Sequence, residues 1–476
     1  MTVRRLVMTI ILPALAASVA SALPASRPAA EKFIPTFAVC YSDAKAAQSI
    51  EETAKFDMLV LSFGRHTSTV WGRDGRNSFV TLRVLNPDIV IAIYALGPGE
   101  YNTAAWGQIG EGWNWLKENH GRGSANCWTA LGRKTGAYLQ GVPYPNERLM
   151  NLANTNWQRY WCDRVYTDYW GGRKGIDLAG ADAVFADNVQ YQLIWQGQWH
   201  AEGHPDQPDE PTTYFAEGKW RNDRWRSDCR RFLDLAIPAF AAQGLGFIPN
   251  FGYMGRNPEY WQELDGLPNP PYAGMEEGGF VCPWGGDGKS FKFWDWEKKL
   301  PVFTGLRHTK ALMHNHGGFF AGSGLAAMDG ADANGMTGWD ALWFSLTSFL
   351  LGFDDATRNG FLSFTVWKTG EYHYFDEFDP RYLHLGKAQG PCEKRGACYY
   401  RQFDDGWVVV NPTAEAAHNV SVPQAQARVL THANFRDCSR TPLVARFDLP
   451  AHRGVVLLSE GRQAGNADNP MTTAKR

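Results

Sequence analysis

The chain has 476 residues, with 47 Lys and Arg against 49 Asp and Glu, for a formal net charge of −2. No block of like charges stands out, which argues against nucleic acid or an anionic membrane as the main partner. The 20 Trp, 18 Tyr and 27 Phe residues favour carbohydrate as a ligand, because aromatic faces can stack on sugar rings while their edges stay wet. The length exceeds one average domain and predicts a large domain followed by a small one.

The N-terminus has the three parts of a secretory signal. Arg4 and Arg5 form a positive region, an apolar run of about 14 residues follows to Val19, and Ala20 to Ala22 make an A-x-A cleavage site. We expect a signal peptide over residues 1–22 and a secreted or periplasmic protein; the alternative is a retained N-terminal anchor. No later segment has 18 uncharged apolar residues, so the mature chain is expected to have no membrane contact.

Short apolar runs alternate with longer amphipathic ones, which is typical of βα units around a parallel sheet. The runs predict a (β/α)8 TIM barrel over residues 33–390, although an open doubly wound sheet would give a similar alternation. Helical spacing is clearest in residues 157–169, 232–240 and 342–350. The eight expected strands are 37–41, 58–63, 89–94, 183–186, 245–249, 272–275, 310–313 and 361–366.

Two further regions depart from this alternation. Residues 97–156 form a long insertion rich in Trp, Tyr and Gly, which we interpret as a subsite wall over the barrel mouth; a small aromatic subdomain that only packs on the barrel is the alternative. Residues 395–459 contain short strands and an Asp-Gly turn, which predict a small antiparallel β-sandwich, and residues 460–476 are expected to be disordered. We also expect a disulfide between Cys392 and Cys398, which enclose only five residues.

Cleavage of a glycosidic bond needs two carboxyl groups, and in a barrel both must lie at the C-terminal ends of strands. One expected strand runs directly into Asp187 and Asn188; Asp187 is a catalytic candidate, with capping of a following helix as the alternative. Another ends in Glu276 and Glu277 before two glycines. Because neighbouring residues on a strand face opposite sides, only one of the two can point into the mouth, and Glu277 is favoured because it is nearer the tip.

These motifs resemble the glycoside hydrolase families related to α-galactosidases and endo-α-1,4-polygalactosaminidases, above all hypothetical glycosyl hydrolase family 15. The resemblance lies in a strand that reads Val-Phe-Ala-Asp-Asn, a later strand with Glu before Gly, and the barrel and sandwich order, over most of residues 35–458. It implies a retaining hydrolase, with Asp187 as nucleophile and Glu276 or Glu277 as acid/base. A transglycosylase or lyase on the same barrel and a non-catalytic carbohydrate-binding protein are the alternatives.

Polar and aromatic residues at the other strand ends complete the expected substrate site. Asn250 could bond a sugar hydroxyl or close a turn, and His314 and His316 could bind hydroxyls or support charge. A zinc pair at the two histidines lacks a third ligand, so we expect no metal and no cofactor. The full set of expected substrate-binding residues is Tyr41, Asp43, Arg65, Tyr94, Asn188, Asn250, His314, His316, Trp367 and Lys368.

Overall fold

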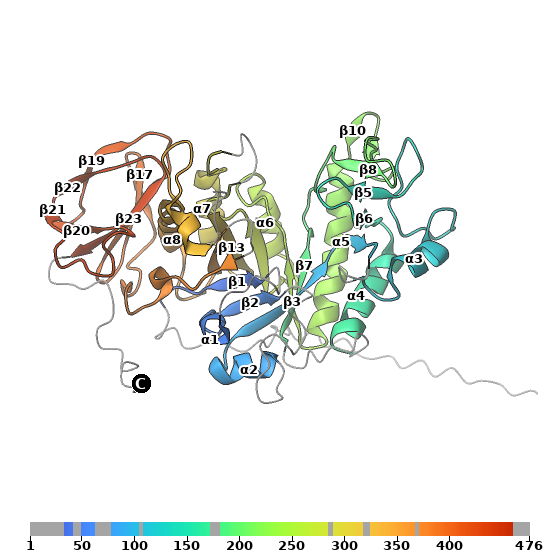
Figure 1. Ribbon diagram of the computed structural model, residues 1–476, viewed down its shortest axis with the longest axis horizontal. Helices are drawn as coiled ribbons and strands as arrows, with labels where there is room; N and C mark the ends of the chain where they lie inside the picture. The colour runs from blue at the N-terminus through green and yellow to red at the C-terminus, as the bar shows by residue number, and fades with distance from the viewer. Residues whose placement is uncertain are drawn as a thin grey trace, which may run out of the picture.

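Eight parallel strands lie where the sequence predicts them, in two sheets (Figure 1). The computed structural model describes residues 33–40, 49–61, 78–103, 108–171, 181–283, 289–317, 324–366 and 371–459; the expected signal peptide and C-terminal tail lie outside these ranges. The first sheet has, in order, β1 (Phe37–Cys40), β2 (Met58–Leu61), β3 (Val90–Leu96), β7 (Ala183–Asp187) and β11 (Gly246–Pro249). The second has β12 (Ala273–Glu277), β13 (Lys310–Gly317), β14 (Gly360–Val366) and the short antiparallel β15 (Glu371–Tyr372).

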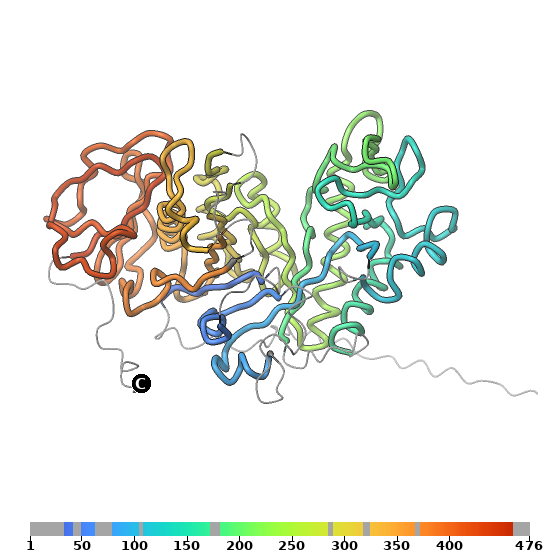
Figure 2. Tube along the Cα trace, in the orientation of Figure 1, coloured from blue at the N-terminus to red at the C-terminus, as the bar shows by residue number. Residues whose placement is uncertain are grey.

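Single parallel bridges connect the outermost parallel strands of the two sheets. Asn250, which follows β11, is bridged to Met275 of β12, and Thr36, which precedes β1, is bridged to Leu362 of β14. Figure 2 shows the dark blue N-terminal strand running beside the orange part of the chain, in agreement with the second bridge. The mixed α/β class expected from the sequence is therefore confirmed.

Alternate residues of all eight parallel strands meet in one buried cluster, which we call the interior cluster. The intervening residues pack against helices in the larger core. Successive side chains of a strand point to opposite faces, so a strand that is covered on both faces contributes to two buried clusters. The interior cluster consists of Phe37, Val39, Met58, Val60, Val90, Ala92, Ala183, Phe185, Ile248, Ala273, Met275, Leu312 and Phe361, with Tyr94 and Tyr272 partly buried against it.

Helices connect the strands and cover their outer faces. The three helices with the clearest sequence signal are α4 (Thr155–Tyr169), α5 (Asn222–Ala241) and α8 (Gly338–Gly352). Each has an apolar face buried against the sheets, as its spacing predicts. Within the described ranges, no helix has both the length and the apolar character that a membrane span requires. The described helices outside the long insertion also include α1 (Ile50–Thr53), α2 (Ser78–Leu85), α6 (Pro258–Asp265), α7 (Trp296–Gly305) and the 3-10 turns η4 (Gly324–Asp329) and η5 (Asp376–Phe378).

The long insertion after β3 forms its own antiparallel sheet, on the right of Figure 1. It contains β4 (Gly99–Tyr101), α3 (Gly112–His120), β5 (Leu139–Gly141) and β6 (Glu147–Leu149). The sheet order is β4-β6-β5-β8, so its last strand, β8 (Trp199–Ala201), comes from the loop that follows β7. A hairpin of β9 (Phe215–Ala216) and β10 (Lys219–Trp220) completes this region. Two loops that begin at neighbouring strands are thus joined into one unit beside the strand ends.

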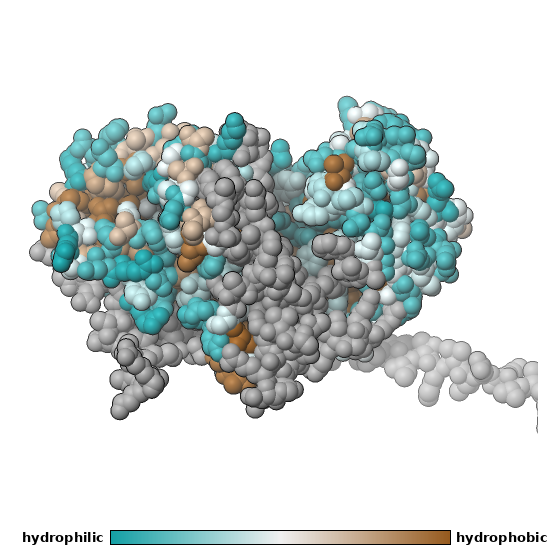
Figure 3. All heavy atoms as spheres, in the orientation of Figure 1, coloured by the Kyte–Doolittle hydropathy of each residue, from teal (hydrophilic) through white to brown (hydrophobic). Residues whose placement is uncertain are grey.

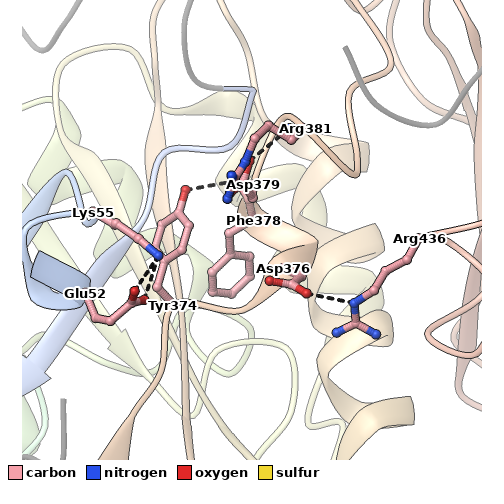
Figure 4. A network of polar contacts seen from close by, with 8 residues as sticks. All are labelled: Glu52, Lys55, Tyr374, Asp376, Phe378, Asp379, Arg381 and Arg436. Atoms are coloured by element: carbon pink, nitrogen blue, oxygen red, sulfur yellow. Dashed lines mark hydrogen bonds and ion pairs between the residues drawn. The ribbon is translucent and has the colours of Figure 1, made fainter. Parts of the chain in front are cut away.

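The C-terminal strands form two antiparallel sheets around a core of their own. One face of the larger sheet packs on α8, where Arg401 Nη1 donates to the carbonyl oxygen of Leu350 at 2.8 Å. Arg436, between β20 and β21, forms an ion pair with Asp376 at 2.7 Å. Figure 4 shows this pair within a network of polar contacts. The strands are β16 (Glu393–Arg395), β17 (Cys398–Gln402), β18 (Gly406–Asn411), β19 (Ala417–Ser421), β20 (Ala427–Leu430), β21 (Leu443–Val444), β22 (Arg446–Leu449) and β23 (Arg453–Ser459).

The expected disulfide between Cys392 and Cys398 is wrong, because both thiols are free. In the hairpin of β16 and β17, Cys398 lies opposite Arg395, and pairing then runs outward to Glu393 opposite Tyr400. Cys392 therefore lies several residues along the ladder from Cys398. The two thiols also belong to different cores, since Cys398 lies in the core of the C-terminal sheets and Cys392 packs against the main core. The disulfide was predicted from close spacing in the sequence alone, and that spacing does not reveal the register of the hairpin.

Candidate functional site

The ends of β7, β11 and β12 bring two carboxylates onto one amide. Nδ2 of Asn250 donates to Oδ1 of Asp187 at 2.8 Å and to Oε2 of Glu277 at 2.8 Å. Two contacts of this length to one nitrogen cannot place the two oxygens farther apart than about 5.6 Å, and retaining glycosidases hold their carboxyl pair at about 5–5.5 Å.

Strand alternation explains why these three side chains meet. Asp187 continues the inward series of Ala183 and Phe185, and Glu277 continues that of Ala273 and Met275. Asn250 is two residues beyond the inward Ile248. All three therefore point to the same side as the interior cluster, at the carboxyl end of the strands.

Asp187 is half-buried and is held by three donors. Besides Asn250, the hydroxyl of Tyr94 donates to Oδ2 at 2.7 Å and the backbone N–H of Asn188 donates to Oδ1 at 2.9 Å. Asn188 has a left-handed φ of 59°, which Asn tolerates better than most residues. Burial raises the pKa of Asp187, and the three hydrogen bonds oppose that rise by favouring the charged form.

Glu277 is exposed to solvent at the strand tip, yet protein atoms surround its carboxyl group closely enough to remove much of its hydration. This desolvation, together with the nearby charge of Asp187, raises the pKa of Glu277 to about 7. The hydrogen bond from Asn250 opposes the rise. The two carboxyl groups thus differ in a useful way, because Asp187 has three donors to stabilise its charge and Glu277 has a pKa suited to giving and taking a proton.

Glu276 faces away from this site. Its side chain is 5% exposed and lies 2.8 Å from Nζ of Lys299 on α7, whose side chain is 6% exposed. Oε2 of Glu276 also accepts from the backbone N–H of Met254 at 2.9 Å. Lys299 makes a further hydrogen bond to the carbonyl oxygen of Gly279. Of the two candidate glutamates, the structure therefore brings only Glu277 to Asp187 and places Glu276 in a buried ion pair on the helix side.

His314 and His316 lie within β13, which extends further than the sequence predicts, and not beyond its end. Both are buried, their rings are 4.2 Å apart, and Nδ1 of His314 is 3.1 Å from Oγ of Ser363. Burial lowers the pKa of His314 to about 3, so this ring is neutral. Among the described residues, no group of three or more His, Cys, Asp or Glu is arranged to hold a metal ion.

A third carboxyl group near Asp187, that of Glu147, was not predicted from the sequence. Glu147, the first residue of β6, is buried. Burial and the charge of Asp187 raise the pKa of Glu147 well above its usual range. Tyr101 pairs with Glu147 across the sheet, and the hydroxyl of Tyr101 is 3.3 Å from the hydroxyl of Tyr94. The insertion therefore contributes directly to the surroundings of Asp187.

The structure decides two alternatives that the sequence left open, for Asp187 and for Asn250. The helix-cap interpretation of Asp187 is wrong, because no helix follows it directly and the next one, α5, begins at Asn222. Asn250 donates to both carboxylates, so it does more than close a turn. Five of the expected substrate-binding residues, Tyr41, Asp43, Arg65, Trp367 and Lys368, lie outside the described residues.

One family of known proteins matches most of the chain. The model of hypothetical glycosyl hydrolase family 15 matches residues 83–407, which include all three strand ends of the site. The chain belongs to this family. The resemblance inferred from the strand motifs is therefore confirmed, and family membership supports a glycosidase role. No curated protein matches the chain.

Solved structures of glycoside hydrolases resemble the chain only distantly. A GH36 α-galactosidase from Geobacillus stearothermophilus is 10% identical with a TM-score of 0.40, covering 90% of this chain and 55% of its own. An isomaltulose synthase from Erwinia rhapontici is 11% identical with a TM-score of 0.43, over 89% of this chain and 98% of its own. A GH31 dextranase from Flavobacterium johnsoniae is 10% identical with a TM-score of 0.39, covering 91% of this chain and 53% of its own. The chain spans about half the length of the galactosidase and the dextranase.

Proposed function

We propose that the protein is an exported glycoside hydrolase that cleaves poly- or oligosaccharides with retention of anomeric configuration. The observation that carries the proposal is the shared contact of Asp187 and Glu277 with Asn250, which keeps their two bonded oxygens within about 5.6 Å, closer than the roughly 6.5–9.5 Å of an inverting pair. Asp187 is the nucleophile and Glu277 the acid/base, while Glu276 has a structural role in its pair with Lys299.

The fold proposed for the catalytic part is a closed (β/α)8 barrel. It is supported by the two bridges between the outer strands and by the interior cluster, to which all eight parallel strands contribute. In such a barrel the C-terminal strand ends form the mouth in which catalysis takes place. The C-terminal sheets would be a β-sandwich that supports α8, and residues 1–22 a signal peptide that directs secretion or export to the periplasm.

The two carboxyl groups have complementary tasks in the proposed reaction. Protonated Glu277 gives its proton to the glycosidic oxygen while ionised Asp187 attacks the anomeric carbon, so the bond to the leaving sugar breaks as the glycosyl ester forms. Glu277, now ionised, takes a proton from water, which attacks the same carbon and releases Asp187. Asn250 holds both carboxyl groups in place. Because its Nδ2 donates to each of them, the negative charge keeps a hydrogen bond whether it is on Asp187 or on Glu277.

The proposal is tested by incubating the purified protein with a panel of α-linked and amino-sugar polymers and their oligosaccharides. Product anomers are followed by NMR from the first minutes. We expect one class of substrate to be cleaved and the first-formed product to keep the anomeric configuration of the substrate. Cleavage with inversion would contradict the retaining mechanism, and the absence of cleavage across the panel would contradict the enzymatic function.

A further inference from the structure

An exposed aromatic side chain stands beside the carboxylate site without a role in the proposed reaction. Tyr144, in the turn between β5 and β6, is 59% exposed, whereas most large aromatic side chains of the described residues are buried or half-buried. Its ring lies 5.3 Å from that of Trp195 at an interplanar angle of 34°, and Trp195 lies 5.4 Å from the buried Trp199. Tyr144 is therefore supported from one side and open to solvent on the remainder.

The backbone holds Tyr144 in a rigid turn. The N–H of Glu147 donates to the carbonyl oxygen of Tyr144 at 2.9 Å, and Pro145 occupies the second position, where its fixed φ suits a turn. Nη1 of Arg148 also donates to the carbonyl oxygen of Pro145 at 2.6 Å. A side chain presented this way loses little freedom when a ligand binds to it.

The support beneath Tyr144 is equally specific. Trp195 has a left-handed φ of 56°, an uncommon conformation for a bulky residue. A Cβ at Gly141 would lie 2.7 Å from the Trp195 ring, so the close contact between ring and hairpin depends on glycine at this position. The N–H of Val142 donates to the carbonyl oxygen of Gln198 at 2.9 Å, which fixes the β7–β8 loop to the hairpin.

The same turn ties Tyr144 to the reacting groups. Three residues after Tyr144, Glu147 pairs with Tyr101 across the sheet. The Tyr101 hydroxyl is 3.3 Å from that of Tyr94, which donates to Oδ2 of Asp187 at 2.7 Å. Burial raises the pKa of the Tyr144 phenol, and the charges of Glu277, Asp187 and Glu147 raise it further. Figure 3 shows a hollow in the molecular surface beside the insertion.

We propose that Tyr144, backed by Trp195, is a subsite for a second sugar ring, next to the ring held between Asp187 and Glu277. The aromatic face offers an apolar surface to the C–H face of a pyranose, and its wet edge tolerates the hydroxyl groups. This inference rests on the proposed glycosidase function and adds a substrate class to it. The preferred substrate is a saccharide of at least two units, and Tyr144 discriminates it from a single glycosyl unit with a small leaving group.

The test compares two kinds of substrate with the same reacting sugar. Glycosyl fluorides, such as α-glucosyl and α-galactosyl fluoride, have a leaving group too small to reach Tyr144, whereas the matching di- to tetrasaccharides can reach it. We expect Tyr144→Ala to lower kcat/KM for the oligosaccharides by about tenfold or more and to leave kcat/KM for the fluoride within about twofold. Tyr144→Phe should retain most of the oligosaccharide activity, because the stacking face remains.

Val142→Ala is the matched control, since Val142 is 48% exposed on the same hairpin and is not aromatic. It should leave both substrates unaffected. Equal losses on both substrates with Tyr144→Ala, or no loss on either, would overturn the subsite. Failure of the unmodified protein on every fluoride and every oligosaccharide would instead overturn the proposed function, so the two failures are distinguishable. Thermal unfolding of each variant checks that the hairpin remains folded.

Discussion

Asp187 and Glu277 accept hydrogen bonds from one nitrogen atom, Nδ2 of Asn250, each at 2.8 Å. A single side chain therefore sets both the spacing of the two carboxyl groups and part of their electrostatics. The hydrogen bonds favour the charged form of each, against the burial that favours the neutral form.

Replacement of Asn250 should shift the pH dependence of catalysis upward. In Asn250→Ala both carboxyl groups lose a donor that favours ionisation, so the pKa of each rises. The acidic limb of kcat/KM reflects ionisation of Asp187 and the alkaline limb reflects loss of the proton from Glu277, so both limbs should move to higher pH. The measurement is a pH profile from about pH 4 to 9. A profile with unchanged limbs, or one shifted to lower pH, would show that Asn250 does not control these groups.

Substitutions of the two adjacent glutamates should have different effects, one on the stability of the protein and the other on its activity. Glu276→Gln leaves the Lys299 ammonium group buried without its partner, which should cost about 3–5 kcal/mol of unfolding free energy while the folded fraction stays active. The double variant Glu276→Gln with Lys299→Met should recover much of that loss. Denaturant unfolding and activity per folded molecule are the two measurements. If Glu276→Gln is stable but inactive, the assignment of the two glutamates is reversed.

Glu277→Gln should behave in the opposite way. It removes the proton donor, so activity should fall most for substrates with poor leaving groups, and azide should restore turnover of activated ones. Because the folded-state pKa of Glu277 is raised from 4.5 to about 7, its contribution to stability is present below about pH 4.5 and lost as the pH rises through 7. Glu277→Gln should therefore melt at a higher temperature than the unmodified protein at pH 8 and at a similar temperature at pH 4. Equal melting temperatures at pH 8 would count against the raised pKa.

The C-terminal sheets should be inseparable from the rest of the protein. Val408, Val410, Val456 and Leu458 belong to the same buried core as α8, so a chain that ends near Gly390 exposes that helix and should be insoluble. A milder test is Gly454→Ala, because a Cβ there would lie 1.8 Å from Oγ1 of Thr347 on α8. We expect a loss of about 1–3 kcal/mol in unfolding free energy. Gly390→Ala, whose Cβ would meet nothing within 4 Å, is the control. A soluble and fully active truncation would show that the sheets are dispensable.

Much of the site could be predicted because it follows from strand alternation. An apolar run that ends in Asp187 marks that residue, and alternation allows only one of Glu276 and Glu277 to face inward. Which of the two glutamates it is stayed open until the strand register was known. Glu147 could not be found in this way. Its strand is three residues long, and the sheet around it is completed by β8, about 50 residues further along the chain. Long-range pairing of this kind leaves no periodic signal in the sequence. The Cys392–Cys398 expectation failed for the same reason, because hairpin register is a property of pairing and not of spacing.

Asp187→Asn is the most direct test of the proposed mechanism. The amide has the volume of the carboxylate, its oxygen can still accept from Asn250 and Asn188, and its NH2 group can donate to the Tyr94 hydroxyl in place of accepting from it. Folding and melting temperature should therefore be close to those of the unmodified protein. A neutral amide cannot form the glycosyl ester, so turnover should fall by at least about a thousandfold. Asp187→Ala adds a check on the chemistry, because azide admitted to the space left by the side chain should attack the anomeric carbon from the same face and give a glycosyl azide of inverted configuration. If Asp187→Asn folds and retains its turnover, Asp187 is not the nucleophile, however well its spacing from Glu277 suits the role.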